Sequence, residues 1–143
     1  MRTFNELGVA PEIQQALEEL GFEQPMPVQA EVIPQLLDQT KNIIALAQTG
    51  TGKTAAFGIA VIQKTNLKQL SPQTLILCPT RELCLQISGD LTDFSKYVED
   101  IKILPVYGGS SIESQIRSLK RGVHIIVATP GRLLDLIKRK TVS

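Results

Sequence analysis

Four short apolar runs, separated by helix-like segments, constrain the fold of this chain more than any other feature. The runs cover residues 42–47, 74–78, 101–107 and 124–129, and helices are expected at roughly 53–65, 81–98, 111–120 and 132–139. Three runs are almost continuously apolar, which is typical of strands buried on both faces of a parallel sheet. The third run contains Pro105, which cannot donate to a sheet ladder and therefore indicates an edge strand. Because strands alternate with helices, we predict an α/β fold with a parallel sheet.

Two further helices are expected before the first strand. One begins at Pro11, since proline suits a first helical turn, and stops at Gly21. The other begins at Pro27 and contains Pro34, which we expect to kink it. The chain has 143 residues, a length that fits one domain with its own core.

Composition and charge narrow the function classes. The chain is 43% hydrophobic and 20% charged, which is typical of a globular protein rather than a disordered one. Its formal net charge is +1, so contacts with nucleic acid must come from locally placed Arg and Lys side chains. No apolar run is long enough for a membrane span, and the first residues lack an apolar signal core.

Cys78 and Cys84 are expected to be buried free thiols, which favours a reducing, cytoplasmic setting.

Short polar motifs follow each predicted strand. They read QTGTGKT after the first strand, PTRE after the second, GGSS after the third and TPGR after the fourth. In open parallel sheets, ligands bind at the carboxyl ends of the strands. Four such loops at one edge therefore predict a single extended site.

The stretch AQTGTGKT, residues 47–54, is typical of a phosphate-binding loop. Gly50 and Gly52 allow a tight turn that presents backbone N–H groups, and the following helix points its positive end at the same place. Lys53 can reach β- and γ-phosphate oxygens, and the Thr54 hydroxyl can bind Mg²⁺. The strict pattern has Gly where this chain has Ala47. The simpler alternative is a glycine-rich turn with a surface lysine.

Taken together, the motifs resemble a known family. GFEQPMPVQ at 21–29, followed by AQTGTGKT, PTREL, the glycine pair and TPGR, is similar to the amino-terminal part of the first RecA-like domain of DEAD-box RNA helicases. The resemblance covers nearly all of residues 1–143 and depends on five motifs in the same order. It implies a P-loop NTPase fold, ATP with Mg²⁺ as cofactors, and RNA as a partner.

The resemblance also implies residues for nucleotide binding. A glutamine amide can pair with adenine N6 and N7, and Gln29 occupies the family's adenine-reading position. Met26 is a departure, because the family usually has Thr there, and we expect little cost from it. The residues implied for binding nucleotide are Phe4, Phe22, Gln29, Ala47, Gln48, Thr49, Gly50, Thr51, Gly52, Lys53 and Thr54, with Lys53 and Thr54 also serving catalysis and Thr54 the metal.

Three motifs are implied for RNA binding, at residues 79–83, 108–109 and 129–132. Arg81 and Arg132 each open a predicted helix, near N–H groups that suit a phosphate. Such contacts hold the RNA backbone without reading its sequence. The residues concerned are Pro79, Thr80, Arg81, Gly108, Gly109, Thr129, Pro130, Gly131 and Arg132. The alternative is that PTRE and TPGR are only helix caps.

His124 is the chain's single histidine and opens the last predicted strand. An ordinary surface or boundary position is expected for it, with no catalytic role. The sequence shows no cluster of His, Cys, Asp and Glu residues with the spacing of a metal site.

Several parts of the family's machinery are expected to be missing from these residues. They are the DEAD tetrad, the serine–alanine–threonine motif and the second RecA-like domain. Because phosphoryl transfer needs a carboxylate for the metal, we expect negligible hydrolysis by these 143 residues alone. Strand 42–47 would also lack the family's usual partners, so we expect a rearranged edge or strand-swapped self-association.

Two other functions remain open at this stage. One is a non-catalytic fragment that binds nucleotide or RNA without turnover. The other is a P-loop kinase or GTPase of a different class. Gln29 distinguishes this last alternative, because it predicts a preference for adenine over guanine.

Overall fold

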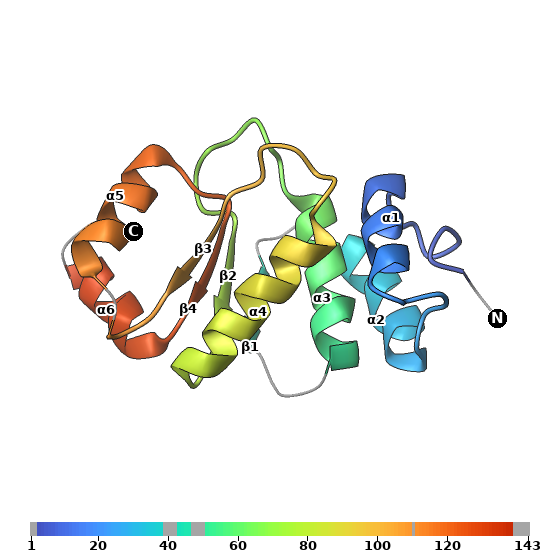
Figure 1. The fold of residues 1–143 in the computed structure, drawn as a ribbon, viewed down its shortest axis with the longest axis horizontal. Coiled ribbons are helices and arrows are strands. Elements are labelled where there is room, and N and C mark those ends of the chain that lie inside the picture. Colours follow the sequence, from blue (N-terminus) through green and yellow to red (C-terminus); the bar gives the residue numbers. More distant parts are fainter. Residues whose placement is uncertain (1–2, 39–42, 47–50, 110, 139–143) are drawn as a thin grey trace. The chain divides into compact units, whose positions relative to one another are not determined.

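The computed structural model describes residues 3–38, 43–46, 51–109 and 111–138 (Figure 1). The helices are α1 (Pro11–Glu19), α2 (Pro27–Asp38), α3 (Thr51–Lys64), α4 (Arg81–Phe94), α5 (Ile112–Arg121) and α6 (Pro130–Lys138). The strands are β1 (Ile43–Leu46), β2 (Thr74–Leu77), β3 (Ile103–Val106) and β4 (Ile125–Ala128). Strands and helices therefore alternate from β1 onward, as the sequence predicts. No helix in these ranges is both long and apolar enough to cross a membrane.

The chain divides into two structural units. The first unit holds the amino-terminal segment, α1, α2, α3 and the end of α4. The second unit holds the four strands, the first turns of α4, and helices α5 and α6.

The sheet of the second unit is parallel throughout, in the order β1-β2-β4-β3. The strand with Pro105 lies at one edge, which confirms the prediction made from that proline. β1 lies at the other edge of the described sheet and pairs with β2, from Ile43 opposite Thr74 to Leu46 opposite Leu77. The predicted α/β parallel architecture is therefore confirmed.

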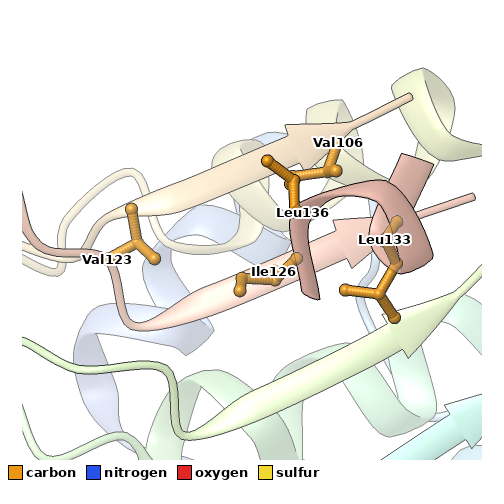
Figure 2. Packing of buried hydrophobic residues seen from close by; sticks show 6 residues of the cluster. Val106, Val123, Ile126, Leu133 and Leu136 are labelled. Atoms are coloured by element: carbon orange, nitrogen blue, oxygen red, sulfur yellow. The ribbon is translucent and has the colours of Figure 1, made fainter. Parts of the chain in front are cut away.

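The core of the second unit lies on both faces of the central strand β4, whose four residues are all buried. On one face, a cluster joins β3, β4 and α6, and Figure 2 labels its side chains Val106, Val123, Ile126, Leu133 and Leu136. Apolar side chains of α5 pack against the same cluster. Ile125 and Val127 alternate to the opposite face and are also fully buried. Helices α5 and α6 thus cover one side of this edge of the sheet (Figure 1).

Both cysteines are buried free thiols, as predicted. The Cys84 thiol, in the first turns of α4, donates to the Val127 carbonyl at 3.0 Å. A hydrogen bond with Cys84, reinforced by burial, raises the pKa of the Cys78 thiol above its ordinary value. Cys78 is therefore protonated at neutral pH and serves as a packing residue beside the sheet.

In the first unit, hydrogen bonds fix how the chain leaves α1 and reaches α3. Gly21 has a φ of +91°, and the N–H groups of Gly21 and Phe22 bond to the carbonyls of Glu18 and Leu17. This is a Schellman ending of the helix, so the predicted stop at Gly21 is confirmed. Gln63 of α3 accepts from the Ala10 N–H at 2.8 Å and donates to the Gly8 carbonyl at 2.6 Å. The amino-terminal segment is therefore tied to α3.

Helix α4 is shorter than the predicted range of 81–98. It ends at Phe94, and the next residue, Ser95, donates its hydroxyl to the Leu91 carbonyl at 2.8 Å. The chain then continues in short turns, in which Lys96 N–H bonds to Asp93 and Val98 N–H to Ser95. Serine side chains that bond to nearby backbone compete with helix continuation, so helical periodicity in the sequence extends past the real end.

The expected boundary position of His124 is wrong. Its side chain is 0% exposed, and its Nδ1 accepts the Lys102 N–H at 3.0 Å. Nδ1 is therefore the unprotonated nitrogen, so Nε2 carries the hydrogen and donates to the Leu67 carbonyl at 3.2 Å. His124 joins the start of β3 to the loop before β2.

Replacing this imidazole should destabilise the second unit. We expect His124→Leu to lower the free energy of unfolding by about 1–3 kcal/mol, because two backbone groups lose their partner. His124→Asn should cost less, since its Oδ1 can still accept the Lys102 N–H. Urea unfolding followed by circular dichroism measures both values, and equal stability of the leucine variant and the parent chain would contradict this role.

Candidate functional site

Strand register brings three of the predicted loops to one edge of the sheet. Leu77 and Val106 both lie opposite Ala128, so β2, β4 and β3 end at the same level. The segments that follow are 79–81, 107–109 and 129–132, and all belong to the second unit. We call this edge the rim. The predicted shared edge is confirmed for these three motifs, whereas residues 47–50 of the fourth lie outside the described residues.

Two of the predicted RNA-binding motifs touch at the rim. The Arg81 guanidinium lies over the Tyr107 ring, 5.5 Å from its centroid, a cation–π arrangement. Gly109 has a φ of +85°, and a Cβ there would lie 3.1 Å from Arg81 Nη1. Glycine at 109 thus permits both the left-handed backbone and the close approach of the arginine.

The third motif is joined to the second through a residue that the sequence reasoning missed. Arg132 Nη1 donates to Gln115 Oε1 at 3.0 Å, and Gln115 Nε2 donates to the Tyr107 carbonyl at 3.2 Å. Gln115 lies on α5 and is 5% exposed. A signal for it exists, because Gln115 interrupts the apolar stripe made by Ile112, Ile116 and Leu119.

The two threonines of the rim also have structural roles. Thr80 Oγ1 accepts the Leu83 N–H at 3.2 Å, so Thr80 caps α4. Thr129 N–H bonds to the Val106 carbonyl at 2.9 Å, and its carbonyl accepts from Leu133 at the start of α6. The helix-cap alternative is therefore correct for the Thr80 side chain, whose hydroxyl keeps its own O–H donor for a further contact. The Thr129 hydroxyl instead donates to the Val106 carbonyl at 3.5 Å, and Thr129 bonds to α6 through its backbone carbonyl.

The phosphate loop is only partly within the described residues. Ala47, Gln48, Thr49 and Gly50 lie outside them, and for Thr51, Lys53 and Thr54 only the backbone is described. That backbone forms the first turn of α3, directly after the loop. The predicted order of strand, loop and helix is thus present in β1 and α3. The positions of the Lys53 and Thr54 side chains lie outside what the structure describes.

Gln29 occupies the third position of α2 and is 0% exposed. Its Oε1 accepts the Met26 N–H at 3.0 Å, and the Met26 carbonyl accepts from Ala30. Met26 is therefore the N-cap of α2, and Gln29 supplies half of a capping box. An amide oxygen can accept two hydrogen bonds, so this role is compatible with reading an adenine amino group.

The two predicted aromatic residues lie in the first unit with Gln29. Phe4 is buried, and its carbonyl accepts from Val9 in the amino-terminal turn. Phe22 packs edge to face against Phe94, with ring centroids 6.1 Å apart. Both rings therefore take part in the packing of the unit. Their predicted contact with adenine stays a prediction.

Acidic side chains offer no metal centre in the described ranges. No group of three or more His, Cys, Asp or Glu side chains that could hold an ion occurs there. A Mg²⁺ ion held mainly by nucleotide phosphates and one hydroxyl needs no such cluster. The predicted Thr54 ligand fits that mode of binding by its chemistry.

Comparison with protein families gives one matching model. The model described as DEAD/DEAH box helicase matches residues 26–143. The DEAD-box ATP-dependent RNA helicase CshA of Geobacillus kaustophilus is 50% identical over 142 residues, which cover 99% of this chain and 30% of that protein. The ATP-dependent RNA helicase DeaD of Escherichia coli is 46% identical over 141 residues, covering 99% and 22%. This chain therefore spans less than a third of either relative.

Solved structures of DEAD-box proteins are also similar to this chain. A crystal structure of a DEAD box protein from the hyperthermophile Methanococcus jannaschii has a TM-score of 0.86 and 42% identity, covering 99% of this chain and 38% of that one. S. cerevisiae Dbp5 bound to RNA and ADP BeF3 has a TM-score of 0.81 and 34% identity, covering 100% and 36%. With the parallel sheet, these likenesses confirm the predicted RecA-like α/β fold.

The half-complete capping box at α2 leads to a stability prediction. Met26 has no side-chain acceptor for the Gln29 N–H, whereas a threonine hydroxyl supplies one. We expect Met26→Thr to stabilise the chain by about 1 kcal/mol, which corresponds to a rise in melting temperature of about 3 °C. Met26→Ala is the matched control, because it shortens the same 46% exposed side chain without adding a hydroxyl. Equal melting temperatures for the two variants would contradict the capping role.

Proposed function

This chain belongs to the DEAD/DEAH box helicase family, and from that premise we propose that it forms part of an ATP-dependent RNA helicase. Its 143 residues supply the adenine- and phosphate-binding site and part of the RNA-binding site. The observation that carries the proposal is the rim, where Arg81, Tyr107, Gln115 and Arg132 link three motifs in one unit. The names of the relatives, which are ATP-dependent RNA helicases, support it.

For the nucleotide, the proposal assigns roles to the phosphate loop and to Gln29. The loop of residues 47–54 holds the phosphates through its N–H groups, Lys53 contacts the β- and γ-phosphates, and Thr54 binds Mg²⁺. The ion neutralises phosphate charge when it is bound with ATP. Gln29 reads the adenine edge, with Phe4 and Phe22 shaping the surrounding pocket. The ADP BeF3 bound in the Dbp5 structure supports this assignment.

For RNA, the proposal assigns the rim to the sugar–phosphate backbone. Arg81 and Arg132 lie in the first turns of α4 and α6, where helix N-termini favour a phosphate. Thr80, Thr129 and the backbone of residues 108–109 and 130–131 complete the track. Because no base edge is needed for these contacts, binding should be independent of sequence. The RNA bound in the Dbp5 structure supports RNA as the partner.

The mechanism that follows is closure around two ligands. A second RecA-like domain would close against ATP and single-stranded RNA, bend one strand and so separate a short duplex, and hydrolysis would reset the open state. The 143 residues alone should hydrolyse ATP negligibly, because they contain no DEAD tetrad to hold the metal. RNA-stimulated release of phosphate by these residues would contradict that expectation.

The alternative function is binding of nucleotide or RNA without hydrolysis. It applies to these 143 residues if hydrolysis needs parts of the longer relatives that they do not contain.

The edge position of β1 bears on self-association. β1 lies at an edge of the described sheet, and an exposed strand edge favours pairing with another copy. Strand-swapped self-association is therefore part of the proposal, and light scattering at several concentrations measures it.

Base choice tests the nucleotide half. We expect ADP with Mg²⁺ to bind this chain in calorimetric titration and GDP not to bind, because Gln29 matches the adenine edge. Gln29→Glu should weaken ADP binding about 10- to 100-fold, since a carboxylate lacks the N–H donor for adenine N7.

The same variant separates base reading from folding. A glutamate at position 29 can still accept the Met26 N–H and keep the capping bond. Circular dichroism should therefore show the helix content of the parent chain, although burial of the carboxylate lowers the melting temperature. Gln29→Ala loses both functions and is the matched comparison. Equal binding of ADP and GDP, or unchanged ADP affinity in Gln29→Glu, would overturn the adenine assignment and favour another class of P-loop protein.

A further inference from the structure

One buried polar side chain of the rim, Gln115, has been given no role of its own in RNA binding so far. Gln115 lies on the apolar face of α5, whose Ile112, Ile116 and Leu119 pack against the cluster shown in Figure 2. A glutamine at such a position costs stability unless its amide is hydrogen-bonded. Its bonding partners therefore indicate why a polar residue stands there.

The two hydrogen bonds of Gln115 fix the orientation of its amide. Arg132 can only donate, so the atom 3.0 Å from its Nη1 is the amide oxygen. The Tyr107 carbonyl can only accept, so the atom 3.2 Å from it is the amide nitrogen. Both ends of the amide are thus matched to their partners. Neither can be exchanged without placing two donors or two acceptors together.

These bonds belong to a longer chain of contacts. Arg132 is held by Gln115, Gln115 by the backbone of Tyr107, and the Tyr107 ring lies against Arg81. The chain of contacts joins the starts of α6 and α4 through the end of β3. Gln115 is its buried member, and it is on an element that carries none of the predicted RNA-binding motifs.

We propose that Gln115 is a positioning residue for RNA binding, which holds the Arg132 guanidinium in the orientation that meets a backbone phosphate. This inference rests on the proposed function of the rim. A guanidinium is planar and its five donors point in fixed directions, so one bond to a buried amide sets the plane of the others. Arranging a long side chain before RNA arrives removes part of the ordering cost of binding.

The test is a double-mutant cycle on RNA affinity. Gln115→Met preserves side-chain volume and removes both hydrogen bonds, and Arg132→Met removes the phosphate contact. We expect Gln115→Met to weaken binding of a fluorescein-labelled ten-nucleotide oligouridylate about 3- to 10-fold in the parent chain. In the Arg132→Met background, the same change should alter the dissociation constant by less than about 1.5-fold.

The salt dependence gives a second readout that a purely structural role would not change. The slope of log affinity against log salt concentration is negative, and losing one phosphate contact to a single strand reduces its magnitude by about 0.7. We expect both Gln115→Met and Arg132→Met to reduce the magnitude of the slope by about this amount. An unchanged slope in Gln115→Met, beside a reduced slope in Arg132→Met, would contradict the proposal.

The matched control is a glutamine at the other end of the same sheet. Gln73 precedes β2, and its side chain bonds to the backbone of Asn66 and Gln69. Gln73→Met should change RNA affinity by less than about twofold while lowering the melting temperature. A loss of RNA affinity equal to that of Gln115→Met would mean that any destabilised glutamine produces the effect, and would overturn the proposal.

The outcomes separate this inference from the proposed function. If the parent chain does not bind RNA, or if Arg132→Met binds as tightly as the parent, the RNA-binding rim itself is wrong. If Arg132→Met weakens binding and Gln115→Met does not, the rim stands and the role of Gln115 is wrong. Equal losses from Gln115→Met in both backgrounds would also overturn the role.

Discussion

The parallel register of β2, β4 and β3 is the constraint on which the rest of the second unit depends. Because Leu77, Ala128 and Val106 lie level with one another, the loops that follow them leave the sheet at one edge. Apolar packing of α5 and α6 on one face of β4 holds that register. On the other face Ile125 and Val127 are fully buried, and the Cys84 thiol donates to the Val127 carbonyl. A shift of one residue would turn these buried side chains to the wrong face.

Local structure and binding chemistry use the same residues in this chain. Gln29 caps α2 while its proposed role is to read adenine, and Thr80 caps α4 within a proposed RNA-binding motif. Helix N-termini need hydrogen-bond acceptors and attract phosphates for the same reason, which is their exposed N–H groups. Structural and functional readings of these motifs are therefore compatible, and variants such as Gln29→Glu are needed to separate them.

The sequence predicted the parts of the fold that depend on local patterns. Apolar runs located the strands, Pro105 located an edge, and Gly21 located a helix end. It failed where distant contacts decide the outcome. His124 is buried because Lys102 and Leu67 supply its partners, and α4 ends early because Ser95 bonds back to its last turn. Gln115 and Tyr107 were missed because their importance lies in contacts with Arg132 and Arg81. The sequence marks Gln115 only as a polar residue within an apolar helix face, and it does not indicate the partner.

Chemical-shift mapping tests whether the rim binds RNA. Unlabelled single-stranded RNA is added to the ¹⁵N-labelled chain, and the amide signals are followed by nuclear magnetic resonance. We expect the largest shifts at Arg81, Gly108, Gly109, Gly131 and Arg132. We expect small shifts along α1, whose Glu12, Glu18 and Glu19 are exposed. Shifts concentrated outside the rim, or none at saturating RNA, would contradict the account.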